Sequence, residues 1–168
     1  YKKTIVVSGG VGIAIAYPVA KKLKKLSASV DFIAGFRNKD LIILENDIKA
    51  VSDNFDVTTD DGSNGKKGFV TNVLEEKLSE NSDFDVVIAI GPLPMMKAVC
   101  NVTKKFNIKT IVSMTAIMID GTGMCGGCRL NVGGKIKFAC VDGPDFDGHE
   151  VNFDETMSTL RFGARAKK

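Results

Sequence analysis

Short apolar runs alternate with longer amphipathic segments along residues 1–115. The apolar runs predict strands at residues 3–8, 29–36, 56–59, 84–90 and 109–114. Apolar positions that recur with a helical period predict helices at residues 13–26, 41–51 and 67–80, and a fourth helix after Pro92 and Pro94. Strands that are apolar along their whole length need cover on both faces. This order therefore predicts an α/β fold, a five-stranded parallel sheet with helices on both faces.

The alternation ends near residue 115, where a glycine-rich segment with cysteines begins. Two short runs in this segment, RLNV and KIKFAC, flank Gly133-Gly134 and predict a β-hairpin. The sequence thus predicts an α/β domain at residues 1–115 and a small subdomain of cysteine loop and hairpin at residues 116–156. A C-terminal tail occupies residues 157–168.

Composition and charge exclude several classes of protein. The 23 basic and 20 acidic residues are scattered, and the chain has no Trp and only two Tyr, so nothing favours a nucleic-acid partner. No apolar run approaches the ~18 residues of a membrane-spanning helix, which argues against a membrane partner. No signal peptide is visible, so we expect a cytoplasmic protein with reduced cysteines. The start at Tyr1, without Met, predicts that the chain is the C-terminal portion of something longer.

Three turns after predicted strands have the composition of a nucleotide site: SGGVG, TTDDGSNG and IGPLPM. Ligands of open α/β sheets bind outside the carboxyl ends of strands, where glycines let a pyrophosphate approach the N-terminus of a helix. The aspartates can accept hydrogen bonds from ribose hydroxyls, although a tight turn and ordinary turn aspartates are the plain alternatives. Arg37 can meet a 2′-phosphate, which leaves NAD and NADP both open. The candidate cofactor-binding residues are Gly9, Gly10, Val11, Gly12, Asp60, Asp61, Gly91, Pro92 and Met95.

The cysteine segment carries a second candidate site. Cys125, Cys128 and Cys140 follow a C-x2-C-x11-C pattern, and Asp120 stands five residues before Cys125. This is the C-x4-C-x2-C spacing of plant-type [2Fe-2S] proteins, with Asp120 in place of the first cysteine. Glycines between the ligands suit a loop wrapped around a cluster, whose backbone N–H groups can point at sulfur.

Other interpretations of the cysteine segment stay open. Structural zinc can be bound by the three cysteines with Asp120 or His149. Cys125 and Cys128 can instead form a dithiol–disulfide pair, or Asp120 can be a plain turn residue while another group is the fourth ligand. We expect His149 to be an exposed loop residue. Cys100, on an apolar helix face, is predicted to be a small core hydrophobe.

The motifs S-G-G-V-G-I-A, T-D-D-G-S-x-G and G-P-x-P-M, followed by the cysteine segment, resemble the ferredoxin–NADP reductase superfamily. Residues 4–156 are similar to two of its branches: electron-transfer subunits of type B dihydroorotate dehydrogenase, and small subunits of NADH-dependent reduced ferredoxin:NADP oxidoreductase (sulfide dehydrogenase). Ile15 departs from a proline that is frequent in the family. The resemblance implies a nicotinamide-dinucleotide domain followed by a [2Fe-2S] domain.

The resemblance also implies an activity. Electrons would pass between NAD(P)H, FAD and the [2Fe-2S] cluster to a larger flavin and iron–sulfur partner subunit, and no side chain would act as acid, base or nucleophile. The family's N-terminal FAD barrel, with its Arg-x-Tyr-Ser motif, has no counterpart here, so we expect this chain to be inactive alone.

Asp120 distinguishes the branches of the family. The resemblance implies ligation by Asp120, Cys125, Cys128 and Cys140 in the ferredoxin:NADP oxidoreductase branch, and by four cysteines in the dihydroorotate dehydrogenase branch. The aspartate favours the former branch. The dihydroorotate dehydrogenase electron-transfer subunit is the second hypothesis, and a zinc-stabilised nucleotide-binding protein without a redox role is the third.

Overall fold

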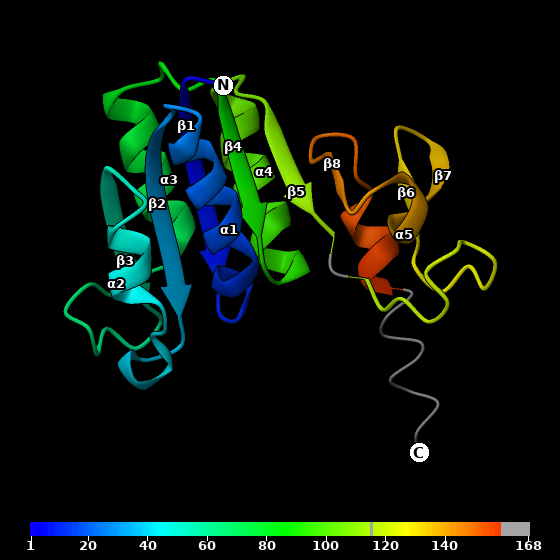
Figure 1. Cartoon of the computed structure of the whole chain (residues 1–168), viewed down its shortest axis with the longest axis horizontal. Helices are drawn as coiled ribbons and strands as arrows, with labels where there is room; N and C mark the ends of the chain where they lie inside the picture. Colours follow the sequence, from blue (N-terminus) through cyan, green and yellow to red (C-terminus); the bar gives the residue numbers. More distant parts are fainter. Residues whose placement is uncertain (115, 159–168) are drawn as a thin grey trace.

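The computed structural model describes residues 1–114 and 116–158. Its centre is a six-stranded sheet of order β3-β2-β1-β4-β5-β8 (Figure 1). β1 to β5 are parallel, and β8 pairs antiparallel with β5. The strands are β1 (Lys3–Gly9), β2 (Ser29–Phe36), β3 (Asn54–Thr59), β4 (Val86–Ile90), β5 (Thr110–Ser113) and β8 (Asp145–Asp147).

Helices cover both faces of the sheet and give it two separate cores. Alternate residues of β1 enter opposite cores, because side chains alternate across a strand. Ile5 and Val7 pack with the buried residues of α3 and α4, whereas Val6 packs with those of α1 and α2. These helices are α1 (Gly12–Lys25), α2 (Glu45–Lys49), α3 (Val70–Glu80) and α4 (Leu93–Lys105), with a 3-10 turn, η1, at Lys39–Leu41.

The five parallel strands lie where the apolar runs predict them, but two other predictions need correction. The sheet is not purely parallel, because residues 145–147 add the antiparallel edge strand β8, which has no apolar run to announce it. The helix predicted at residues 41–51 is only η1 and the short α2. Leu44, at a left-handed φ of 57°, stands between them and prevents one continuous helix.

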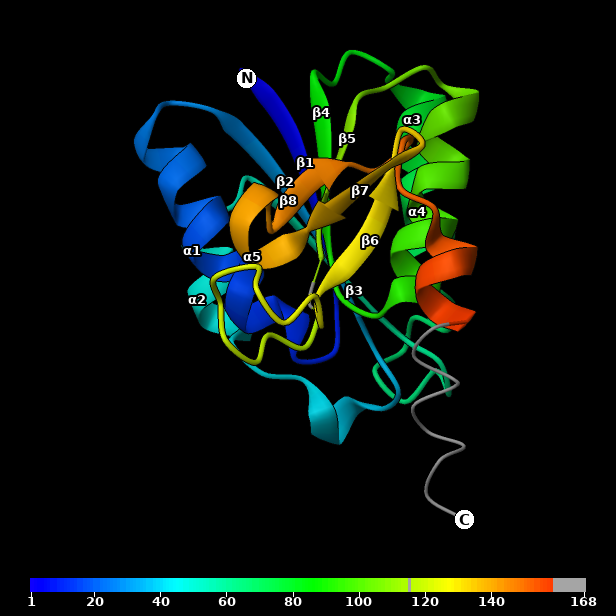
Figure 2. The same cartoon turned by 90° about the vertical axis from the view of Figure 1, so that its right-hand side faces the viewer.

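The cysteine segment folds beside β8, on the β5 side of the sheet, and Figure 2 looks onto that side. Strands β6 (Arg129–Val132) and β7 (Lys135–Phe138) form the predicted hairpin. Both turn glycines, Gly133 and Gly134, have positive φ, as a type I′ turn requires. β7 ends earlier than the KIKFAC run predicts, so Cys140 lies in the short helix α5 (Ala139–Asp142). Among the described residues, no helix could cross a membrane.

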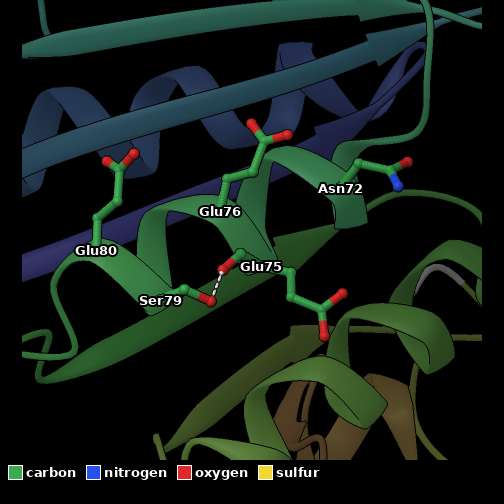
Figure 3. A pocket seen from close by; sticks show the side chains of 5 residues that line it. All are labelled: Asn72, Glu75, Glu76, Ser79 and Glu80. Carbon is green, nitrogen blue, oxygen red and sulfur yellow. Dashed lines mark hydrogen bonds between the residues drawn. The ribbon is translucent and has the colours of Figure 1, made fainter.

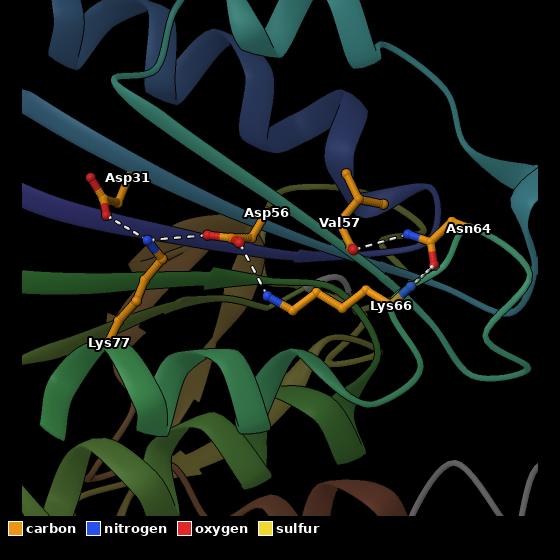
Figure 4. Close-up of polar contacts among 6 residues, drawn as sticks. All are labelled: Asp31, Asp56, Val57, Asn64, Lys66 and Lys77. Carbon is orange, nitrogen blue, oxygen red and sulfur yellow. Dashed lines mark hydrogen bonds and ion pairs between the residues drawn. The ribbon is translucent and has the colours of Figure 1, made fainter. Parts of the chain in front are cut away.

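A chain of ion pairs joins α3 to the edge of the sheet (Figure 4). Lys77 Nζ lies 2.9 Å from Asp31 Oδ2 and 3.1 Å from Asp56 Oδ2, and Lys66 Nζ lies 3.2 Å from Asp56 Oδ1. Burial acts to raise the pKa of Asp56, but hydrogen bonds from Lys77 and Lys66 outweigh it and hold that pKa below its usual 3.8. Asp56 therefore contributes stability above pH 3.8, and this stability is lost as the pH falls through the lower folded-state pKa.

Lys77→Met is expected to lower the free energy of unfolding by about 2 kcal/mol at neutral pH, because two carboxylates lose their shared cation in a largely buried place. The stability of the variant should also change less than that of the wild type between neutral pH and about pH 3.5. Urea unfolding at both pH values measures both effects. Lys49→Met, which breaks an exposed pair with Glu45, is the control and should change little. An equal loss in the two variants would contradict the special role of Lys77.

Candidate functional site

The strand order reverses between β1 and β4. From β1 the chain builds β2 and β3 to one side, and then β4 and β5 to the other. Turns after adjacent parallel strands lie together at the carboxyl edge, so the β1–α1 turn and the β4–α4 turn are neighbours. A reversal of this kind is where open α/β sheets bind their ligands.

Three glycines let these two turns touch. A Cβ on Gly12 would lie 2.6 Å from the carbonyl oxygen of Ile90, and one on Gly91 would lie 3.0 Å from the backbone nitrogen of Gly9. A Cβ on Gly9 would lie 2.5 Å from Met95 Sδ. The structure therefore places Gly9, Gly12, Gly91 and Met95 in one packed layer beneath the predicted pyrophosphate site.

Gly10 has the opposite surroundings. Its φ is +53°, a left-handed value that favours glycine, and a Cβ there would meet nothing within 4 Å. The space around Gly10 is therefore open. The next residue, Val11, is 83% exposed. No side chain caps α1, and its first turn holds no acidic residue. The positive end of this helix is thus open to an anion.

The acidic turn after β3 lies beside the end of β2. The backbone N–H of Asp60 donates to Phe36 O at 3.0 Å, and that of Asp61 donates to Arg37 O at 3.3 Å. Asp61 Oδ1 accepts from the N–H of Ser63 at 2.9 Å. The hydroxyl of Ser63 helps to hold the pKa of Asp61 below its usual value. The Asp61 carboxylate is thus used to stabilise the turn. The exposed Asp60 is the better candidate to accept a hydrogen bond from a ribose hydroxyl.

Within the cysteine loop, backbone N–H groups point at the predicted ligands. Asp120 accepts from Thr122 N at 2.9 Å and from Cys125 N at 2.6 Å, and these bonds, that of Thr122 first, lower its pKa. Gly127 N donates to Cys125 Sγ at 3.4 Å. Cys140 N donates to Cys128 Sγ at 3.4 Å and lowers the pKa of that thiol, which favours the metal-binding thiolate.

The four predicted ligands come together in pairs. The backbone N–H of Cys125 donates to Asp120 Oδ2, and the backbone N–H of Cys140 donates to Cys128 Sγ. The Cys128 side chain raises the pKa of Cys140. The negative charge of Asp120 raises the pKa of Cys140 further. In the part of the chain that the structure describes, no group of three or more His, Cys, Asp or Glu side chains is arranged to hold one metal ion.

Cys100 and Cys125 should differ strongly in reactivity. Cys100 is 5% exposed, and burial, followed by the charge of Asp147, raises its pKa to about 12. Cys125 is exposed. In reduced protein stripped of metal with a chelator, we expect iodoacetamide at about pH 8 to modify Cys125 at least about tenfold faster than Cys100. Mass spectrometry of the peptides measures both rates, and equal rates would contradict the burial of Cys100.

His149 is not the exposed loop residue that the sequence suggests. It is half-buried, and its Nε2 lies 3.0 Å from the hydroxyl of Thr103 on α4, which also accepts from Thr110 at 2.6 Å. His149 therefore joins the C-terminal segment to α4 of the nucleotide half. It is not grouped with the candidate ligands of the cysteine loop in the part of the chain that the structure describes. Its partner, the buried Thr103, has no sequence signal that links it to His149.

A shallow hollow on α3 is not part of the site. It is lined by Asn72, Glu75, Glu76, Ser79 and Glu80, all from that one helix. Figure 3 shows its carboxylates pointing in different directions. This is a solvated helix face.

Comparison with known proteins now identifies the family. Residues 6–101, which hold most of β1, the strands β2 to β4 and the glycine turns, match the model of the oxidoreductase NAD-binding domain. This chain belongs to that family. Residues 115–152 of this NAD-binding oxidoreductase chain match a second model, the iron–sulfur cluster binding domain of dihydroorotate dehydrogenase B. The chain thus joins a ferredoxin reductase-like NAD-binding domain to an iron–sulfur binding domain like that of dihydroorotate dehydrogenase electron-transfer subunits.

Individual relatives agree with both matches. The NAD-binding oxidoreductase chain is 50% identical over 157 residues to an uncharacterised protein of Clostridium beijerinckii, covering 93% of the chain and 53% of the relative. It is 46% identical over 160 residues to a dihydroorotate dehydrogenase B (NAD⁺) electron-transfer subunit homologue of Thermotoga maritima, covering 95% and 56%. A solved structure of NADH-dependent reduced ferredoxin-NADP oxidoreductase, from work on flavin-based electron bifurcation, is 46% identical with a TM-score of 0.85, covering 94% and 56%. The chain spans little more than half the length of these relatives.

Proposed function

We propose that this chain is the nucleotide- and cluster-binding part of an electron-transfer subunit in a flavin- and iron–sulfur-dependent NAD(P)H oxidoreductase. The observation that carries this proposal is the backbone pairing of Cys125 with Asp120 and of Cys140 with Cys128, in a loop whose N–H groups point at two of the sulfurs. A nicotinamide dinucleotide would bind at the carboxyl edge of the neighbouring sheet, which brings both functions into one chain.

The donor set fits a [2Fe-2S] cluster better than a single zinc ion. Each iron of a [2Fe-2S] centre takes two protein ligands, so four ligands divide into two pairs. A structural zinc instead draws its four ligands around one ion. Backbone hydrogen bonds in this loop join Cys125 to Asp120 and Cys140 to Cys128. No three of the described candidate side chains are arranged around one ion. Asp120, Cys125, Cys128 and Cys140 are therefore proposed to hold a [2Fe-2S] cluster.

The residues of the chain would bind and orient the cofactors, while a bound iron–sulfur cluster supplies one-electron transfer. The open turn at Gly10 and the uncapped start of α1 would receive the pyrophosphate of the dinucleotide. Asp60 would accept a hydrogen bond from a ribose 2′-hydroxyl, which favours NAD(H) over NADP(H). The proposal assigns FAD to the intact protein and a larger oxidoreductase subunit as its partner.

Iron and sulfide analysis of the anaerobically purified chain tests the proposal. We expect about two irons and two sulfides per chain. One zinc without colour would reject the redox function. Rapid reduction of the cluster by NADH without added flavin would contradict the assigned role of FAD, because a hydride carries two electrons and the cluster accepts one.

Asp120→Ala tests the fourth ligand. The EPR spectrum of the reduced cluster is expected to change, since ligation sets the electronic structure of the iron. Asp142→Ala is the matched control, because Asp142 also accepts from a backbone N–H, that of Phe138, in the same subdomain. An unchanged spectrum in the Asp120 variant would mean that Asp120 is a turn residue only.

The dihydroorotate dehydrogenase electron-transfer subunit remains the second candidate. The model matched by residues 115–152 and the Thermotoga maritima relative favour it. Co-purification with a dihydroorotate dehydrogenase catalytic subunit would support this candidate. Asp120 in place of a fourth cysteine favours the ferredoxin:NADP oxidoreductase branch instead.

A further inference from the structure

The turn that carries Asp60 and Asp61 is folded back onto the edge of the sheet. β3 is the edge strand, and the segment after the turn runs alongside it, with Thr59 bridged to Lys67. Thr59 N donates to Lys66 O at 3.0 Å, and Gly68 N donates to Thr59 O at 3.1 Å. The turn therefore lies in a loop that leaves the sheet at Thr59 and returns to Thr59 through Lys66 and Gly68.

Asn64 fills this loop from within and uses both ends of its side-chain amide. Its Nδ2 donates to Val57 O, on the edge strand, at 2.9 Å (Figure 4). Its Oδ1 accepts from the buried Thr59 hydroxyl at 2.8 Å and from Lys66 N at 3.1 Å. One side chain thus replaces a missing strand partner at Val57 O and also joins the Thr59 hydroxyl to the backbone N–H of Lys66.

The same loop is anchored a second time by charge. Lys66, which bonds to Asn64 through its N–H, places Nζ on Asp56, and Asp56 shares Lys77 with Asp31. On the other side, Ser63 Oγ accepts from Lys39 N at 2.7 Å, which ties the loop to the segment after β2. Little freedom is left to the turn between these anchors. Asn64 contacts both β3 and the loop through its neutral amide, and Lys66 contacts both through its charge and its backbone.

We propose that Asn64 is a positioning residue for the adenosine half of the dinucleotide. Its amide holds the Asp60–Asp61 backbone against the ends of β2 and β3, so that the carboxylate of Asp60 is fixed where the ribose arrives. Asn64 does not touch the ligand in this role. The inference rests on the proposed nucleotide function and extends it to a residue that the cofactor would not contact.

NMR titrations of the chain with AMP and with inorganic pyrophosphate test the inference. AMP reports on the ribose end, and pyrophosphate reports on the Gly10 turn alone. Asn64→Ala leaves Val57 O, the Thr59 hydroxyl and Lys66 N without this partner, so we expect the Kd of AMP to rise about fivefold or more. The Kd of pyrophosphate should stay within about twofold, because the β1–α1 turn is unchanged.

Two further variants keep the test sharp. Thr59→Val removes one donor to Asn64 with little change of shape and should weaken AMP in the same direction, by less, even if Asn64→Ala folds poorly. Asn81→Ala is the matched control. Asn81 lies in the loop between α3 and β4, at the amino ends of the parallel strands, and this variant should bind both probes like the wild type.

Each outcome has a distinct meaning. AMP binding unchanged in Asn64→Ala and Thr59→Val would overturn the inference and leave the proposed nucleotide function intact. An equal loss of AMP and pyrophosphate binding would also overturn it, because it would indicate a general structural role. A wild-type chain that binds neither probe would reject the nucleotide function itself, and the inference with it.

Discussion

Cys128→Ser protein is expected to lose its iron–sulfur centre, falling from about two irons per chain to nearly none. Cys128 is 2% exposed, and its sulfur accepts the N–H of Cys140, so the side chain sits inside the loop. Serine keeps the shape but offers a harder oxygen donor that is protonated at neutral pH, where the site needs a thiolate. Iron and sulfide assays with the visible spectrum measure the loss.

Cys100→Ser is the matched control for that experiment. It makes the same chemical change at a buried cysteine on α4, outside the cysteine loop in sequence and not among the candidate ligands. We expect it to retain the full iron and sulfide content, with at most a modest loss of stability from a buried hydroxyl. Loss of iron in the Cys100 variant, or its retention in the Cys128 variant, would show that the ligands are assigned wrongly.

Gly12→Ala should abolish dinucleotide binding and lower the free energy of unfolding by about 2–3 kcal/mol. Its new Cβ would lie 2.6 Å from Ile90 O and 3.1 Å from the Cα of Gly91. Both are backbone atoms, so the clash cannot be relieved by a side-chain rotation, and the start of α1 must move away from β4. Urea unfolding and NADH titration measure the two effects.

Gly10→Ala and Gly134→Ala separate binding from stability. Both glycines have positive φ and no atom within 4 Å of the added Cβ, so both variants should cost about 1 kcal/mol of backbone strain. Gly10 lies in the proposed pyrophosphate turn, whereas Gly134 lies in the hairpin. NADH binding that weakens equally in both variants would show that the turn has no specific role.

The parallel strands could be predicted because their signal is local. Runs such as VVIAI, residues 86–90, are apolar throughout, and only a strand covered on both faces buries them all. The hairpin turn could also be predicted from its sequence. Its two central residues, Gly133 and Gly134, both need positive φ values, which favour glycine. The cysteine spacing names the candidate ligands, and the folded loop brings Cys125 to Asp120 and Cys140 to Cys128.

The features that the sequence did not predict depend on distant partners. β8 is three residues long and forms because β5 offers it an edge. His149 is fixed by Thr103, 46 residues away, and neither residue type announces the contact. In the sequence, Asn64 looks like any asparagine in a turn. Only the folded loop shows that its side-chain amide donates to Val57 O on the edge strand β3. The apolar period of residues 41–51 predicts a helix, but Leu44 has a left-handed φ that interrupts it. Tertiary packing outweighs the local helix preference at this position.

The antiparallel strand β8 has a consequence for how the molecule can be divided. The segment that holds the cysteines returns to donate the outermost strand of the nucleotide sheet, so a cut at residue 115 would leave β5 with a bare edge. We therefore expect the two proposed binding sites to unfold as one cooperative unit, so that a destabilised cysteine loop alters the hydrogen-exchange protection of the sheet. An exchange of cluster segments between related proteins would succeed only if the graft carried its own β8.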